Sequence, residues 1–442
     1  MRTLFANAYV VTMDDAGTEL ADGWVLVDHA FVEDVGSGNP PPAEHYENLG
    51  GALLTPGLVN THHHLYQTLT RTRAQQADLF AWLRELYPVW ARIDAEAEYA
   101  AARTGLAELA LSGCSTVFDH HYVFPPGRAG LVEAEIQAAR ELGVRIVASR
   151  GSMDLGESQG GLPPDELVEE ADAVLADTEG LAVLHEEGRG ARTQIAVAPC
   201  SPFSVTKRLM TESAALARRL GLRLHTHLAE TVEEEKFCRG IFGCRPLEYL
   251  EQVGWLAGDV WCAHCVHLSN DDVDRFAQAG TGVAHCPTSN MRLGAGIAPV
   301  GALARAGVAV GLGVDGSASN ERGDLLLEAK QALLAARARG GPAALTARDA
   351  LRLATRGGAA VLGRDDLGAL APGHCADLAV WRTDVLSFAG ADDLVAALVL
   401  SAPHTVDRLY VGGEPVVRDG LLVHADEGEI AAEQRRQAAR FL

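Results

Sequence analysis

Residues 56–64 read Pro56-Gly57-Leu58-Val59-Asn60-Thr61-His62-His63-His64, a short apolar run that ends in three histidines. Side chains two positions apart on a strand point to the same face, so His62 and His64 can reach one metal ion. His63 then points the other way, and we expect it to be structural or to lie behind the ligands. This stretch predicts a buried strand that carries metal-binding groups at its carboxyl end.

Similar apolar runs recur along the chain, with amphipathic helical segments such as 166–176 and 271–279 between them. The eight candidate strands cover residues 57–60, 115–119, 145–149, 194–199, 222–227, 260–264, 282–285 and 309–313. Repeated strand–helix units favour a parallel sheet, and eight of them in about 250 residues favour a closed (β/α)8 TIM-like barrel. Functional groups of such barrels lie at the carboxyl ends of the strands.

Both ends of the chain have a residue pattern that differs from that of the strand–helix units. Residues 8–13, 23–28, 377–381 and 406–413 alternate apolar and polar side chains as short strands do, and Gly412-Gly413 is a hairpin signal. We therefore expect a small β-sandwich domain built from residues 1–56 plus 365–442, with a C-terminal helix. Residues 57–364 would form the barrel domain.

Composition limits the partners and the compartment. The 442 residues carry a net charge of −22, which disfavours binding to nucleic acid or to an anionic membrane surface. The amino-terminal residues do not resemble a secretion signal, and no apolar run is long enough to span a bilayer. The eight cysteines are expected to be reduced and mostly buried. We expect a cytoplasmic protein that forms a homo-oligomer and acts on a small molecule.

Three further clusters follow candidate strands five, six and eight: 225–230, 264–267 and 313–316. His227 closes strand five, and Asp315 follows the end of strand eight. With the first cluster they offer three imidazoles and one carboxylate to a divalent ion, from His62, His64, His227 and Asp315. This donor set suits Zn²⁺, and Fe²⁺ or Mn²⁺ would also tolerate it.

Other groups in these clusters are placed for proton transfer. Glu230 lies three residues beyond His227, where it can reach over the metal without binding it. His264 ends strand six, and Asp315 can also accept a proton from bound water. Two other histidines are expected to lie outside the ligand set. We expect His225 to be a core side chain and His267 to be a loop contact.

The number of metal ions follows from the scarcity of lysine. The chain contains only Lys207, Lys236 and Lys330. A barrel hydrolase that bridges two metals with a carbamylated lysine needs that lysine on a strand, typically strand four. Strand four ends near residues 198–200, well before Lys207, so we predict a single metal ion.

These motifs resemble the amidohydrolase superfamily, in the branch that contains guanine-type deaminases, adenosylhomocysteine deaminases and triazine hydrolases. The matching stretches are 56–64, 227–230, 263–267, 285–290 and 313–316, and the likeness extends over nearly the whole chain. The resemblance implies that His62, His64, His227 and Asp315 are ligands. It also implies that Glu230 and His264 transfer protons, with Asp315 as the base.

Within this branch, residues 64–71, 86–90 and 198–204 resemble the 8-oxoguanine deaminase group. Many adenosine-type deaminases carry a histidine where this chain has Cys200. The resemblance implies hydrolytic deamination of an amino-substituted oxo-heterocycle, above all of 8-oxoguanine to urate and ammonia, by a metal-activated water. A guanine or isocytosine deaminase, a triazine-type amino- or chloro-hydrolase, and a non-catalytic barrel scaffold remain alternatives.

Five residues are candidates for substrate contact, although ordinary loop or core packing would also explain each of them. The Gln67 amide offers the donor and acceptor needed to read the edge of a base. Trp82 or Tyr122 could stack on the ring. Cys200 ends strand four facing the expected pocket, and Arg150, which ends strand three, could bind a carbonyl oxygen.

Overall fold

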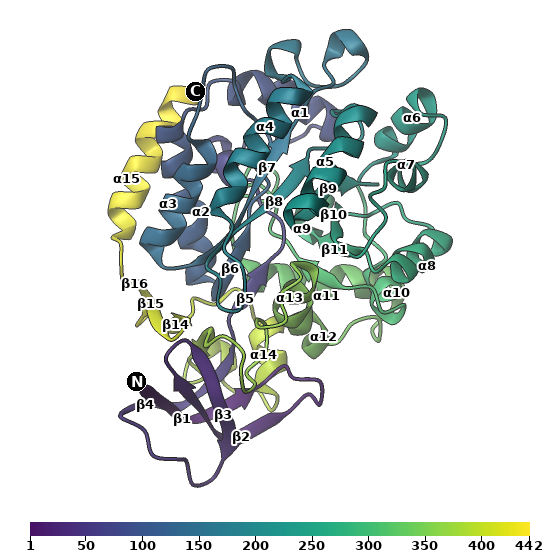
Figure 1. Cartoon of the computed structure of the whole chain (residues 1–442). Coiled ribbons are helices and arrows are strands. Elements are labelled where there is room, and N and C mark those ends of the chain that lie inside the picture. Colours follow the sequence, from purple (N-terminus) through teal and green to yellow (C-terminus); the bar gives the residue numbers. More distant parts are fainter.

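The structure, a computed structural model, describes all 442 residues. Eight parallel strands close into a barrel in the order β10-β11-β12-β5-β6-β7-β8-β9 (Figure 1). They are β5 (Leu58–Asn60), β6 (Cys114–Phe118), β7 (Arg145–Ser152), β8 (Thr193–Pro199), β9 (Arg223–Leu228), β10 (Val260–His264), β11 (Gly282–His285) and β12 (Val310–Leu312). Each predicted run overlaps one strand, which confirms the (β/α)8 fold.

The barrel interior is packed with side chains below the mouth. Phe118 and Trp261 are fully buried there, with ring centroids 4.8 Å apart in an edge-on arrangement. The first and last strands close the barrel where Leu312 pairs with Asn60. Since all eight strands run in the same direction, their carboxyl ends open at one mouth.

Helices surround the barrel and cover its mouth (Figure 1). They are η1 (Leu65–Thr70), α1 (Leu79–Trp90), α2 (Ala95–Leu111), α3 (Leu131–Leu142), α4 (Ala171–Leu181), α5 (Lys207–Leu220), α6 (Val232–Ile241), α7 (Pro246–Gln252), α8 (Asn270–Ala279), α9 (Pro287–Arg292), α10 (Val300–Arg305), α11 (Leu325–Gly340), α12 (Ala347–Arg352), α13 (Gly358–Val361), α14 (Leu394–Leu400) and α15 (Glu427–Ala438).

The helix predicted at 166–176 begins later than expected, at Ala171. Residues Asp165–Leu167 form a single 3-10 turn, and Val168 is extended. The backbone N–H of Glu169 donates to the carbonyl of Met153, 2.8 Å away, so it is not available to start a helix. This tertiary hydrogen bond overrides the local helical pattern.

Strands from both termini form one continuous sheet in the order β16-β15-β14-β13-β4-β1-β2-β3. The strands are β1 (Arg2–Val11), β2 (Glu19–Asp28), β3 (Phe31–Ser37), β4 (His45–Pro56), β13 (Leu378–Trp381), β14 (Arg408–Val411), β15 (Glu414–Arg418) and β16 (Leu421–Leu422). The two halves join where β4 pairs antiparallel with β13. Gly412 and Gly413 have φ of 58° and 79°, as the predicted hairpin turn between β14 and β15 requires.

A buried ion pair connects this sheet to the barrel. Arg145 at the start of β7 donates two hydrogen bonds to the Asp377 carboxylate, both of 2.9 Å. Asp377 also accepts a 2.7 Å hydrogen bond from the Gly412 backbone N–H. Both charged side chains are almost completely buried, so each depends on the other for the interactions that it has lost with water.

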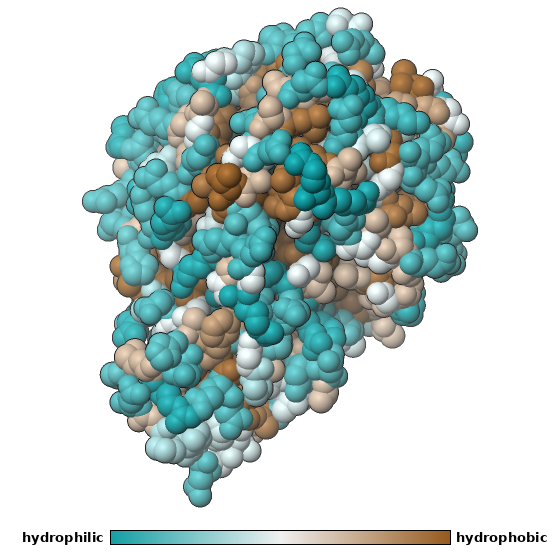
Figure 2. Space-filling model, in the orientation of Figure 1, coloured by the Kyte–Doolittle hydropathy of each residue, from teal (hydrophilic) through white to brown (hydrophobic).

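The outer surface is mainly hydrophilic on the face that Figure 2 shows, with apolar areas separated by polar side chains. No helix of the structure combines the length and the apolar character that crossing a membrane requires. All eight cysteines are buried and unpaired.

Replacing Arg145 with Met should lower the free energy of unfolding by about 3–5 kcal/mol, because the Asp377 carboxylate would stay buried without its partner. Chemical denaturation followed by tryptophan fluorescence measures this change. The matched control is Arg382→Met, which removes an exposed ion pair with Asp384 and should change the midpoint little. Equal effects of the two substitutions would contradict a special role for the buried pair.

Candidate metal centre and pocket

Four side chains from three strand ends meet at the barrel mouth. His62 and His64 follow β5, His227 is part of β9, and Asp315 follows β12. A carboxylate oxygen of Asp315 lies 3.5 Å from His62 Nε2 and 3.4 Å from His64 Nε2. All four residues are buried.

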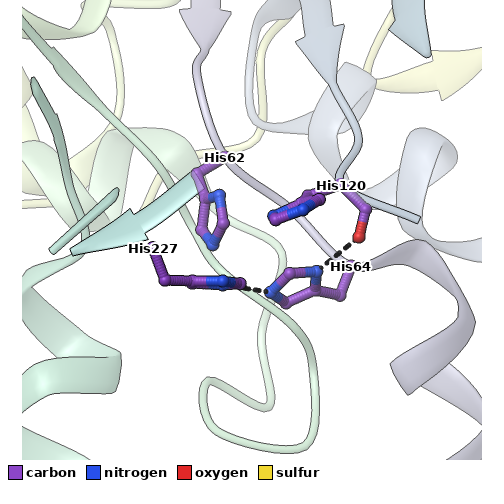
Figure 3. Close-up of side chains that lie close together, drawn as sticks. All are labelled: His62, His64, His120 and His227. Carbon is purple, nitrogen blue, oxygen red and sulfur yellow. Dashed lines mark hydrogen bonds between the residues drawn. The ribbon is translucent and has the colours of Figure 1, made fainter. Parts of the chain in front are cut away.

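The ring nitrogens of His64 and His227 face each other, with 3.2 Å between their Nε2 atoms (Figure 3). The Nδ1–H of His64 donates to the His120 carbonyl at 2.7 Å, and that of His227 donates to the Cys200 carbonyl at 2.6 Å. A carbonyl oxygen can only accept, so in each neutral ring the proton is on Nδ1 and Nε2 carries a lone pair. The two lone pairs would repel each other unless a cation lies between them.

His62 is oriented by a chain of two further groups. His225 Nδ1–H donates to the Trp261 carbonyl at 3.1 Å, which leaves His225 Nε2 as an acceptor. His62 Nδ1–H donates to that nitrogen at 2.9 Å. His62 Nε2 is therefore unprotonated, and it is buried without a hydrogen-bond partner. His225 lies in the core as expected, and it also fixes the tautomer of His62.

The donor set fits a divalent metal ion. Donors bound to one zinc ion at about 2.1 Å lie about 3.0–3.4 Å from each other, close to the separations observed here. Burial lowers the pKa of His64 and of His227 well below the usual value, so both rings are neutral, as ligands must be. Burial opposes ionisation of Asp315, yet the imidazoles that face its carboxylate, above all His62, hold its pKa well below the usual value.

No lysine approaches the centre. Lys207 and Lys236 are exposed on α5 and α6, and Lys330 Nζ donates to the Ala402 carbonyl at 2.9 Å. A carbamylated lysine between two metals therefore has no source in this barrel. The geometry is that of a centre for one ion.

Unusual backbone geometry turns the site residues over the mouth. Asp315, His264 and Ala229 have φ of 62°, 72° and 51°, in the left-handed region that non-glycine residues rarely adopt. Asn60 links the ends of β5 and β12: its Oδ1 accepts from Val314 N at 2.9 Å and its Nδ2 donates to the His62 carbonyl at 3.2 Å. Such strain persists where surrounding contacts enforce it, and it is common at functional sites.

Glu230 and His264 lie beside the centre. His264 Nε2 is 3.6 Å from a Glu230 oxygen and 4.0 Å from an Asp315 oxygen. Burial raises the pKa of Glu230 to about 7, so the carboxyl can hold a proton near neutrality. Burial opposes protonation of His264, but the carboxylates of Glu230 and Asp315 raise its pKa overall.

Two residues that were not predicted from the sequence hold this pair in place. Glu234 accepts the backbone N–H groups of Ala229 and Glu230 at 2.8 and 2.9 Å, which fixes the loop after β9. His264 Nδ1 lies 2.9 Å from Asn290 Oδ1, which orients the ring. Asn290 belongs to the 285–290 motif, so a signal for it was present, whereas nothing near Glu234 distinguishes it from other helical glutamates.

His120 was also not predicted from the sequence. Its ring stacks on His227 with centroids 4.7 Å apart, and its carbonyl orients His64 (Figure 3). His120 Nε2 donates to the Ala198 carbonyl at 2.8 Å, and its Nδ1 has no partner. The available signal was the polar triplet at 119–121, which begins at the last residue of candidate strand two.

A second buried polar cluster lies behind this triplet. His121 Nδ1 is 2.9 Å from Glu135 and 3.7 Å from Glu98, and all three side chains are fully buried. Burial disfavours the charged ring, but the two glutamates hold the pKa of His121 well above its usual value. Nearby, Asp119 accepts the Leu65 backbone N–H at 2.6 Å. The cluster thus anchors the chain directly after His64.

A pocket opens above the centre and contains about 360 Å³ of space, part of it open to solvent. Five of the residues predicted to bind the metal or transfer protons reach it: His64, His227, Glu230, His264 and Asp315. Its remaining lining residues are Gln67, Leu79, Trp82, Leu83, Tyr87, Tyr122, Cys200, Phe203, Leu293 and Ser319. The set includes four of the five candidates for substrate contact.

Arg150 is the exception, and this expectation is corrected. Its guanidinium donates to Glu169 and Asp177, with distances of 2.7 and 2.6 Å, and it stacks over the Phe124 ring. These contacts direct it away from the pocket, toward the extended segment before α4. The side chain supports a loop and does not reach a ligand in the pocket.

Comparison with known proteins gives consistent results along the whole chain. The sequence profile of the amidohydrolase family matches residues 53–416. The chain is 48% identical over 431 residues to an 8-oxoguanine deaminase from Pseudomonas aeruginosa, covering 96% of each protein. It is 38% identical to an isoxanthopterin deaminase from an unknown prokaryote, covering 93% of this chain and 90% of the relative.

Solved structures share the fold as well. The zinc complex of an atrazine chlorohydrolase from Arthrobacter aurescens superposes with a TM-score of 0.94 at 33% identity, covering 99% of this chain and 100% of that one. An adenosine deaminase from Xanthomonas campestris with bound zinc superposes with a TM-score of 0.90 at 27% identity, covering 99% and 98% of the two chains.

The hydrogen-bonded chain behind His62 predicts a variant with weakened metal binding. His225→Phe removes the acceptor for His62 Nδ1–H, so the His62 proton is free to move to Nε2 and block that ligand. Metal affinity, measured by chelator competition, should fall about 10–100-fold. His225→Gln supplies an amide oxygen as acceptor and should keep most of the affinity. Wild-type affinity in the Phe variant would show that the tautomer is fixed in another way.

Proposed function

The chain belongs to the amidohydrolase family, and on that premise we propose that it is a metal-dependent deaminase that hydrolyses 8-oxoguanine to urate and ammonia. The observation that carries the proposal is the set of opposed imidazole lone pairs at the floor of a pocket that also contains Glu230 and His264. Identity of 48% to an 8-oxoguanine deaminase supports the choice of substrate.

A divalent ion held by His62, His64, His227 and Asp315, zinc by the chemistry of these donors, would make water nucleophilic at neutral pH. A carboxylate oxygen of Asp315 accepts a proton from the attacking water and passes it to the leaving ammonia. Glu230 donates a proton to the ring nitrogen next to the amine-bearing carbon, which makes that carbon electrophilic. Glu230 recovers a proton when the attacking oxygen loses its second hydrogen and becomes the carbonyl of the product. His264 Nε2–H donates to the oxygen on which negative charge develops.

The substrate ring is held by side chains from several elements. Both amide atoms of Gln67 are buried without partners, which gives one donor and one acceptor for the edge of a base. Trp82 is fixed by its indole N–H, which donates to the Ala318 carbonyl at 3.2 Å. It lines the pocket together with Tyr122, whose ring centroid lies 5.0 Å from that of His64. Burial raises the pKa of Cys200 to about 12, so it contributes a neutral thiol and no nucleophile.

The charge of the pocket favours a neutral free base. Neither lysine nor arginine lines it, so a phosphate or carboxylate on the substrate would have no cationic side chain as partner. Apolar side chains such as Leu79, Leu83 and Leu293 form much of the remaining wall. An amino-oxopurine matches the mixed apolar and amide lining, whereas the phosphate of a nucleotide would have no lysine or arginine as its partner.

A triazine hydrolase is the second candidate, because the atrazine chlorohydrolase structure superposes with a TM-score of 0.94. Guanine, isocytosine and isoxanthopterin are further amino-oxo-heterocycles to which the same chemistry applies. We also propose a homo-oligomer in the cytoplasm that does not bind nucleic acid. Eight unpaired buried cysteines and the net charge of −22 support the compartment and the lack of nucleic-acid binding.

The choice of substrate is tested by ammonia release from a panel of heterocycles with the zinc-loaded protein. We expect kcat/KM for 8-oxoguanine to exceed that for guanine, isocytosine, isoxanthopterin and adenosine at least tenfold. Chloride release from atrazine is measured in parallel. If another compound has a higher kcat/KM, that compound takes the place of 8-oxoguanine as the proposed substrate. Chloride release without deamination would favour the triazine candidate.

Glu230→Gln tests the proton donor. The variant should keep its zinc and lose about 10²–10⁴-fold in kcat, because Gln cannot donate an acidic proton to the ring. Glu233→Gln is the control, since that glutamate lies three residues further along the chain and its side chain is exposed to solvent. Metal content is measured on both proteins. Nearly full activity of Glu230→Gln would remove this residue from the mechanism.

Gly316→Ala tests the role of Gln67. A Cβ atom at Gly316 would lie 1.9 Å from Gln67 Oε1, so the amide would have to move away from the pocket. We expect KM to rise about 10–100-fold, the loss typical of one or two hydrogen bonds in a buried site, with zinc content unchanged. Gly180→Ala on α4 adds a Cβ with nothing within 4 Å and should have no effect. An unchanged KM in Gly316→Ala would exclude Gln67 from substrate binding.

A further inference from the structure

One wall of the pocket belongs to a long excursion of the chain. Residues 73–92, here called the wall segment, leave the barrel after η1 and return before α2. The segment carries α1 and supplies four lining residues of the pocket: Leu79, Trp82, Leu83 and Tyr87. Its position therefore determines the width and the shape of the space above the metal centre.

Both ends of the wall segment bind the same backbone carbonyl at the end of the chain. Arg73 and Arg92 each donate a guanidinium hydrogen bond to the carbonyl of Phe441, and the Arg92 bond measures 3.0 Å. Arg92 also donates to the carbonyl of Arg440 at 3.2 Å. The Phe441 ring is buried, with the Arg92 guanidinium 5.5 Å from its centroid.

The C-terminal turn that presents this carbonyl is itself held in place. In α15, Gln434 Nε2 donates to Thr68 Oγ1 at 3.1 Å, next to the pocket residue Gln67. Arg440 forms an ion pair with Asp94, the residue that caps the start of α2. Figure 1 shows α15 on the outside of the barrel, where it packs against α2. The Phe441 carbonyl is thus a fixed acceptor on the barrel's outer layer.

The backbone at the start of the wall segment does not hold its conformation alone. Thr72 and Ala74, on either side of Arg73, have φ of 64° and 47°. Residues with a Cβ rarely adopt this left-handed region, and a β-branched threonine is especially unfavourable there. Such geometry persists where contacts enforce it. Arg73 contributes one such contact through Phe441, and Arg292 contributes another by donating to the Gln75 carbonyl at 3.1 Å.

We propose that the C-terminal turn at residues 439–442 positions the pocket wall for substrate, by holding Arg73 and Arg92 at one point. Arg73, Arg92 and Phe441 are positioning residues that do not touch the substrate. Releasing them lowers the fraction of molecules whose wall is ready to bind, and the apparent affinity falls by that fraction. The bound complex restores the wall, so the chemical step changes little. The effect on substrate rests on the deaminase function proposed above.

The test compares Arg73→Met/Arg92→Met with the wild-type enzyme and with Arg436→Met. Arg436 is an exposed arginine of α15 that pairs with Glu433 within the same helix, so it is a matched control. Hydrogen exchange, measured by mass spectrometry on the zinc-loaded full-length proteins, should become at least tenfold faster for amides of residues 79–92 in the double variant. Exchange in the barrel strands should stay unchanged, which also shows that the variant is folded.

Steady-state kinetics with 8-oxoguanine forms the second part of the test. We expect KM to rise about 5–10-fold in the double variant with kcat within twofold of wild type and one zinc per chain. Arg73→Lys/Arg92→Lys keeps a donor at each end and should recover part of the change. Unchanged exchange at 79–92, or equal losses of exchange protection throughout the barrel, would overturn the proposal. A wild-type enzyme inactive on 8-oxoguanine would contradict the proposed substrate, and the exchange data would still decide the role of the C-terminal turn.

Discussion

The site is organised around imidazole rings that each commit one nitrogen to a fixed acceptor. His64 and His227 donate to backbone carbonyls, and His62 donates to a neutral His225. Because these acceptors belong to the barrel strands or to the residues directly after them, the remaining lone pairs are aimed before any ion arrives. The left-handed backbone at Asp315 and the buried cluster behind His64 belong to the same arrangement, since each restrains a residue that we propose as a metal ligand.

Much of this arrangement could be predicted from the sequence because it follows from strand geometry. The spacing of His62 and His64 at the end of one strand, and the repetition of apolar runs that end in polar groups, were sufficient to indicate a barrel with a metal centre at its mouth. His120 and Glu234 escaped prediction because they act through backbone atoms, as a carbonyl acceptor and as a cap on two N–H groups. Such roles leave little trace in residue type or spacing.

Loops were harder to predict than strand ends. Arg150 ends a strand at the mouth, so its position suggested contact with substrate, yet two carboxylates on the segment before and within α4 bind it instead. The same segment contains the Glu169–Met153 backbone hydrogen bond, and α4 begins at Ala171 instead of at the predicted residue 166. In both cases a long-range contact between charged or backbone groups decided the outcome, and single-sequence periodicity does not contain that information. The strand ends thus carry the groups that residue spacing could predict, while the loops above them depend on contacts that the spacing does not reveal.

The composite sheet and the C-terminal turn also have a consequence for biosynthesis and for handling the protein. The sheet is complete only when β4 pairs with β13, which comes more than 300 residues later in the sequence. Phe441 lies 368 and 349 residues after its partners Arg73 and Arg92, so these contacts form only once that late part of the chain has been synthesised. A purification tag fused after Leu442 would be attached beside these contacts. A tag before Met1, which is exposed on the composite sheet at the opposite end of the molecule (Figure 1), would leave them undisturbed.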